Sequence, residues 1–123
     1  MSHWIAVAIG GALGSLGRHA VNVAFGHRLP GAESYGTATV NILGSLAIGV
    51  LAGLIAGGRL QLSPETRIFV FVGLLGGFTT FSSLILDTFT LAEGGRSSAA
   101  IFNVLLQVIV GYAAAYVGFR LAA

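Results

Sequence analysis

The polar side chains that could do chemistry in this sequence lie inside long apolar segments. Of these side chains, Asn41 costs the most free energy to place in the membrane, because its amide has two hydrogen-bond donors that hydrocarbon cannot satisfy. Thr37 and Ser45 lie one helical turn before and after it, so the three residues share one stripe of a helix. Asn41 therefore predicts either an interhelical hydrogen bond or a contact with water or a ligand.

A second polar region is the segment GLLGGFTTFSSL, residues 73–84. Gly76 and Gly77 weaken a helix, and hydroxyl side chains follow them at Thr79, Thr80, Ser82 and Ser83. Together they predict a break in a membrane helix near the middle of the bilayer. The carbonyls freed at the end of the first half-helix suit a cation, and the amides and hydroxyls that start the second suit an anion.

Other residues in the spans could also meet anions. The ring of Phe81 has a positive edge that can accept a small anion, although packing is the commoner role of a membrane phenylalanine. Arg18 lies about four turns into the first apolar segment and either snorkels to the membrane surface or attracts anions. In the last segment, Asn103 and Gln107 share a helical stripe that is either part of a polar route or solvated near the interface.

The composition is that of a membrane protein. Of the 123 residues, 55% are hydrophobic and 8% are charged, and the mean hydropathy is +0.91. A bilayer core needs about 20 apolar residues per helix, and the sequence offers four such spans, at about 4–25, 37–57, 67–91 and 99–120. Short loops join the spans, so residues 1–123 are predicted to form a single all-α transmembrane unit of four helices.

The charges are few and evenly spread. Arginine supplies all six basic residues, and the two sides of the predicted membrane unit carry nearly equal numbers of them. This weak bias favours insertion in both orientations and antiparallel pairing of two copies, although one or two charges could still set a single topology. No basic cluster indicates a nucleic-acid partner.

Several classes of function are disfavoured by what the chain lacks. Without lysine, the glycine-rich stretch has no phosphate-binding Gly-Lys-Ser/Thr motif, and without cysteine the chain has no thiolate metal site. The three histidines lie in or beside the first span, away from Ser82 and Ser83, so no serine hydrolase triad is predicted. We therefore expect that the protein is not an enzyme. The first span also lacks the embedded glutamate that small multidrug transporters carry.

Three stretches together resemble one known family. GGALGSLGR in the first span, GTATVNILGS at the start of the second and GLLGGFTTFSS in the third are similar to the Fluc (CrcB) fluoride channels, in this order and in a chain of this size. The resemblance covers nearly the whole chain. It implies passive, electrodiffusive export of fluoride across the inner membrane of a prokaryote, through two antiparallel pores in a dual-topology homodimer.

The resemblance also implies roles for single residues. In the family the third helix is broken, and the backbone carbonyls that match Gly76 and Thr79 hold a structural sodium ion (Na+) at the dimer interface. By the same similarity, Asn41 donates its amide to fluoride, Phe81 offers its ring edge, and Arg18 lies near an aqueous vestibule. The residues of the predicted fluoride pore are Thr37, Asn41, Phe81, Ser82, Ser83 and Leu84.

The sequence departs from the family pattern in two places. Leu84 stands where relatives usually carry a second phenylalanine, and an aliphatic side chain has no positive edge to offer. Gly111 and Ala115 occupy positions where relatives often have serine or threonine. The departure at Leu84 leaves open that the chain is one half of a heterodimeric fluoride channel. A small proton-coupled exporter of cations or drugs is a further, less favoured alternative.

Overall fold

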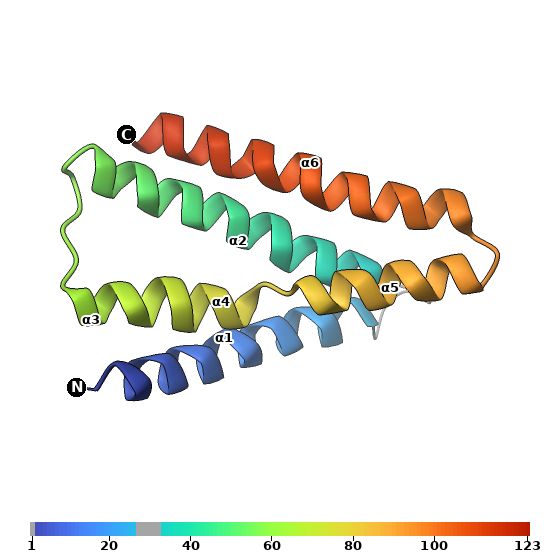
Figure 1. The fold of residues 1–123 in the computed structure, drawn as a ribbon, viewed down its shortest axis with the longest axis horizontal. Helices are drawn as coiled ribbons and strands as arrows, with labels where there is room; N and C mark the ends of the chain where they lie inside the picture. The colour runs from blue at the N-terminus through green and yellow to red at the C-terminus, as the bar shows by residue number, and fades with distance from the viewer. Residues whose placement is uncertain (1, 27–32) are drawn as a thin grey trace.

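The computed structural model describes residues 2–26 and 33–123, and these residues fold into four helical columns (Figure 1). The continuous columns are α1 (His3–Gly26), α2 (Glu33–Ala56) and α6 (Ser97–Ala122). The prediction of an all-helical fold is confirmed for the described part of the chain. The loop predicted after the first span, which carries Arg28, lies outside the described residues.

The third column is divided into shorter helices. Its parts are α3 (Pro64–Arg67), the π-helix η1 (Ile68–Leu75), α4 (Gly76–Phe78) and α5 (Phe81–Glu93). The column begins at Pro64 rather than at the predicted residue 67, because Ser63 caps it. The Ser63 hydroxyl accepts a hydrogen bond from the Thr66 amide at 3.2 Å, and proline suits the first turn of a helix.

Thr79 and Thr80 form the break in the third column. Their backbones are extended, with ψ angles of 158° and 122°. Gly76 and Gly77 come before the break and remain helical in α4. A Cβ at Gly77 would lie 2.7 Å from the Gly11 carbonyl oxygen of α1, so this glycine permits close packing. The hydroxyl residues, rather than the glycines, therefore carry the extended backbone.

Close glycine contacts join the columns. On α1, a Cβ at Gly10 would lie 2.6 Å from the Phe69 carbonyl oxygen of η1, and a Cβ at Gly14 would overlap the backbone of the same column. Between α2 and α6, a Cβ at Gly53 would lie 2.5 Å from the Phe119 carbonyl oxygen. These glycines thus lie on helix interfaces, where the missing side chain lets two backbones approach.

The columns pack in two pairs that place the break inside the bundle. α2 runs along α6, while α1 runs along the first half of the third column (Figure 1). α4 contacts both α1 and α2, and α5 contacts both α2 and α6. The chain between α4 and α5 therefore lies next to α2, the helix that carries Asn41.

Three helical segments of the described residues are long and apolar enough to cross a membrane, namely Tyr35–Ala56, Pro64–Glu93 and Ser97–Ala122. α1 is not among them, although it has 24 residues. It includes the polar residues Arg18, His19 and Asn22. Its passage through the bilayer, as the first of four predicted spans, stays a prediction.

Candidate functional site

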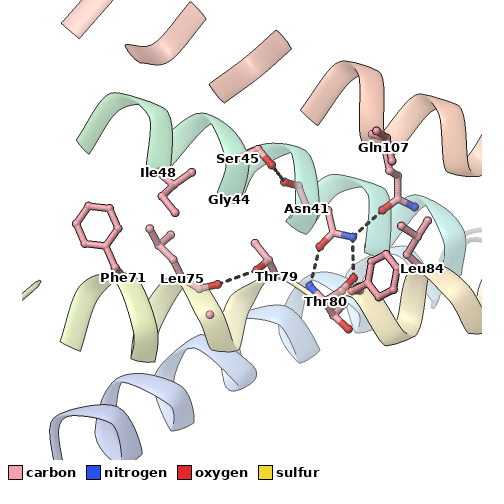
Figure 2. Close-up of a pocket in the computed structure, with 13 residues that line it drawn as sticks. Asn41, Gly44, Ser45, Ile48, Phe71, Leu75, Thr79, Thr80, Leu84 and Gln107 are labelled. Carbon is pink, nitrogen blue, oxygen red and sulfur yellow. Dashed lines mark hydrogen bonds between the residues drawn. The ribbon is translucent and has the colours of Figure 1, made fainter. Parts of the chain in front are cut away.

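The side chain of Asn41 holds the backbone of the break (Figure 2). The Thr80 N–H donates to Asn41 Oδ1 at 2.7 Å, and Asn41 Nδ2 donates to the Thr80 carbonyl oxygen at 2.9 Å. Asn41 thus pairs with Thr80 much as a neighbouring strand would, and it satisfies both backbone groups of that residue. Of the roles that the sequence left open for Asn41, the interhelical hydrogen bond is present.

The break releases backbone carbonyl groups from their helical donors, among them those of Gly76 and Thr79. In a continuous helix the Thr80 N–H would bond to the Gly76 carbonyl, but here it donates to Asn41. Likewise, the Ser83 N–H would bond to the Thr79 carbonyl, but it donates to Thr80 Oγ1 at 3.2 Å. Unwound backbone carbonyls of this kind suit sodium. The carbonyls of Gly76 and Thr79 are of this kind, and their binding of a cation stays a prediction.

Hydroxyl groups start the second half of the broken helix. Thr80 is the N-cap of α5, where its Oγ1 accepts from the Ser83 amide. The same hydroxyl donates to Ser83 Oγ at 3.1 Å and lies 3.4 Å from Ser82 Oγ. These bonds stabilise the start of α5, where the free amides carry partial positive charge.

A chain of side-chain amides leads from the break to α6. Asn41 Nδ2 donates to Gln107 Oε1 at 2.6 Å, and Gln107 Nε2 donates to Asn103 Oδ1 at 3.0 Å. Asn103 Nδ2 then donates to Thr88 Oγ1 at 3.1 Å, and Thr88 Oγ1 donates to the Leu84 carbonyl oxygen at 2.7 Å. Asn103 and Gln107 are 6% and 5% exposed, so the alternative that they are simply solvated is wrong.

A groove of about 370 Å³ lies beside the break, between α2, the third column and α6. Its polar lining includes the side chains of Asn41, Thr79 and Gln107, and no charged side chain lines it. Phe81 also lines the groove and is 73% exposed, whereas Leu84 is only 5% exposed. The groove therefore presents neutral polar groups and an exposed aromatic ring to whatever enters it (Figure 2).

Comparison with known proteins identifies the family. Residues 5–119 match the family described as CrcB-like protein, Camphor Resistance (CrcB). The chain belongs to the CrcB family. Proteins named fluoride-specific ion channel FluC from Nitrobacter winogradskyi, Rhodospirillum centenum and Paracoccus denitrificans are 43%, 45% and 47% identical to it. These alignments cover 95%, 95% and 96% of this chain and 92%, 92% and 93% of the relatives.

Membership of the CrcB family agrees with the predictions from the sequence about family, membrane location and class of function. The resemblance to this family is confirmed over nearly the full length of the chain. The chain is a multi-pass membrane protein, as its composition predicts. Its relatives are named as ion channels rather than enzymes, in agreement with the prediction against an enzyme.

The groove of this CrcB protein brings together five of the predicted site residues, namely Asn41, Gly76, Thr79, Phe81 and Leu84. Three of the predicted pore residues thus line the same groove as the two predicted sodium residues. This surface contains the end of the first half-helix and the start of the second.

The other predicted site residues of the CrcB protein do not line this groove. Thr37 is 3% exposed and lies within the bundle, one turn before Asn41. Ser82 and Ser83 lie at the start of α5 with the capping threonine. Arg18 is half-buried and follows Gly14 by one turn, on the α1 face that meets the third column.

Sequence reasoning did not assign Gln107 and Asn103 to the site. It placed them on one stripe of the last helix, but it gave no partner for either side chain. The available signal was that Asn41 is another amide within an apolar span, and buried amides pair with each other when their helices touch. The spacing of residues within one helix could not show that α2 packs along α6.

Proposed function

We propose that this chain is the subunit of a fluoride-selective channel that lets fluoride leave the cell passively and so lowers fluoride toxicity. Membership of the CrcB family supports this function, as do the names of relatives that share 43–47% identity over nearly their full length. The structural observation that carries the proposal is the break at Thr79 and Thr80, clamped by Asn41 beside a groove with uncharged lining.

The chemistry of the groove suits a small, strongly hydrated anion. Such an ion needs donors that replace its water without trapping it. The Asn41 amide, the amides at the start of α5 and the edge of the Phe81 ring are donors of this kind, because none carries a full charge. Ser82 and Ser83 continue the series of hydroxyls along α5, while Arg18 raises the local anion concentration in a vestibule. A membrane potential that is negative inside then drives the anion outward.

The working channel is a dual-topology homodimer of antiparallel subunits with two pores. The groove is open along one side of the subunit, so a second copy is needed to close it around an ion. The near-equal arginine content of the two sides of the predicted membrane unit supports insertion in both orientations. An antiparallel pair would also bring the breaks of the two third columns together near the middle of the membrane.

A structural Na+ at this interface would be held by the Gly76 and Thr79 carbonyls of both subunits. The donors that these carbonyls would have in a continuous helix are bonded to Asn41 and to Thr80 Oγ1 instead. Both residues line the open groove, so their carbonyls lie near the surface that a second copy would cover. The bound cation would offset the partial negative charge of the freed carbonyls.

Leu84 supports a second candidate, in which this chain is one half of a heterodimeric fluoride channel. Its side chain lines the groove but lacks the positive ring edge that relatives offer at this position. A partner subunit with an aromatic ring would supply the missing donor. The homodimer remains the first candidate, because Phe81 is exposed in the same groove.

Flux from liposomes separates these candidates. Purified protein is reconstituted with a potassium gradient and valinomycin, and a fluoride electrode records the release of fluoride. Release of fluoride without release of chloride by the single purified chain is the result expected for a homodimeric channel. Silence of the chain alone, with flux after a second subunit is added, would replace the homodimer by the heterodimer. Silence under both conditions would contradict the proposed function.

A further inference from the structure

The side-chain amides of Asn41, Gln107 and Asn103 form a row of hydrogen bonds. The direction of each bond in this row follows from the backbone of the break. The N–H of Thr80 must donate and its carbonyl must accept, so Asn41 has to turn Oδ1 toward the first and Nδ2 toward the second. The second N–H of Asn41 then needs an acceptor, which is Gln107 Oε1. By the same reasoning, Gln107 Nε2 donates to Asn103 Oδ1, and Asn103 Nδ2 donates to Thr88 Oγ1.

In this arrangement Asn41, the proposed fluoride donor, has no free amide hydrogen. One of its amide hydrogens serves the Thr80 carbonyl and the other serves Gln107 Oε1. An anion that approached along the groove would also meet the oxygen of Gln107, which repels it. Asn41 can donate to an anion without losing the break only when Gln107 Oε1 moves away.

Resting on the proposed function, we propose that the Gln107 carboxamide is an anion-responsive switch and the second donor of the fluoride site. Half a turn of the Gln107 amide brings Nε2 to the position that Oε1 occupies. The N–H groups of Asn41 and Gln107 then face each other, and a small anion between them accepts from both. Both residues line the groove, which provides the route by which the ion enters (Figure 2).

The rest of the amide chain can follow this rotation at small cost. Gln107 Oε1 now faces Asn103, which also turns by half a turn and donates from Nδ2. The Oδ1 of Asn103 then accepts from the Thr88 hydroxyl. The single bond lost is the one from Thr88 Oγ1 to the Leu84 carbonyl, and that carbonyl keeps its helical amide donor within α5. The row of side-chain amides therefore stays linked by hydrogen bonds in two states, of which one contains the anion.

The packing around this pair favours a small anion. Asn41 and Gln107 lie on α2 and α6, whose backbones touch about two turns further along, where a Cβ at Gly49 would overlap the Ala115 carbonyl oxygen. Close-packed backbones of this kind resist separation. Nδ2 and Oε1 are 2.6 Å apart, so the two side chains must separate before any anion can lie between them, and they must separate further for chloride than for the smaller fluoride.

Side-chain amide NMR of the full-length protein in detergent tests the switch. Titration with NaF is expected to shift the side-chain amide signals of Asn41, Gln107 and also Asn103, which rotates without touching the ion. NaCl at the same concentration is expected to leave them unchanged. A shift of Asn41 alone would overturn the switch, as would equal shifts with both salts.

Fluoride binding and flux by variants complete the test. Gln107→Met has similar length but no donor, and we expect its fluoride affinity to fall about three- to tenfold. The lost hydrogen bond to the charged ion outweighs the gain from an Asn41 amide that Gln107 Oε1 no longer occupies. Gln107→Glu keeps an acceptor for Asn41 and loses the donor, so it is expected to bind no fluoride. Gln61→Met is the matched control, because Gln61 is exposed in the loop between α2 and α3.

The outcomes separate this inference from the proposed function. If the wild-type protein conducts fluoride while Gln107→Met retains full affinity, the switch is overturned and the channel stands. If the wild-type protein conducts no fluoride, the channel is overturned. Fluoride-dependent signals of Gln107 and Asn103 would in that case still support the anion site.

Discussion

Asn41 and Thr80 exchange two hydrogen bonds across the boundary between α2 and the broken third column, at 2.7 and 2.9 Å. A side chain of one helix thereby takes the place of the helical partners that Thr80 lacks. The pairing also diverts the Thr80 amide from the Gly76 carbonyl. A single asparagine thus both stabilises the extended backbone and leaves the Gly76 carbonyl without its helical donor.

Asn41→Leu is expected to lower the free energy of unfolding by about 1–3 kcal/mol, because it leaves the Thr80 backbone groups without a partner. Thermal unfolding in detergent measures this loss, and faster hydrogen exchange of the Thr80 amide locates it. Ser45→Ala is the control, one turn further along α2, where the hydroxyl donates to the Asn41 carbonyl of its own helix at 2.6 Å. Equal stability of the two variants would show that Asn41 does not hold the break.

Gly14→Ala is expected to destabilise the protein by about 1–3 kcal/mol, the usual cost of overpacking a tight interface. The new methyl group would overlap the Leu74 carbonyl oxygen of η1. Gly11→Ala is the matched control on the same helix, because a Cβ there meets no atom within 4 Å. Its stability should be unchanged or slightly raised, since alanine favours helix. The same unfolding midpoint for both variants would contradict the packing described for α1.

The sequence predicted the break better than it predicted the partners of the break. Hydroxyl residues after glycines weaken a helix locally, so residues 73–84 were enough to place the interruption. The link from Asn41 to Thr80 and Gln107 depends on which helices touch, and spacing within one helix does not contain that information. The start of the third column at Pro64 was also missed, although Ser63 followed by proline is a helix-start signal.

Leu84→Phe is expected to raise fluoride flux about two- to tenfold. This range corresponds to the free energy of a specific aromatic contact, about 0.5–1.5 kcal/mol. Leu84 is 5% exposed but borders the groove, so a larger ring can extend into that space. Leu84→Met, which adds length without a ring edge, is the control in the same liposome assay. A fall in flux for phenylalanine alone would mean that this pore is built without a second ring.

Replacement of Na+ by a large organic cation is expected to reduce fluoride flux strongly, because the Gly76 and Thr79 carbonyls would lose their partner. Thr79→Val should keep the sodium requirement, since the proposed ligand is the backbone carbonyl. Valine also keeps the methyl group that contacts Gly44. Flux through liposomes with and without Na+ measures both effects. A sodium requirement that disappears in Thr79→Val would assign the ligand to the hydroxyl instead.

Current through the wild-type protein in a planar bilayer tests the central claim most directly. The purified chain is placed between solutions that differ in fluoride concentration, with chloride and pH equal on both sides. We predict a current that reverses at the equilibrium potential of fluoride and that stays the same when a chloride gradient is added. A reversal potential that follows chloride or protons, or the absence of any current with fluoride, would contradict a passive fluoride channel.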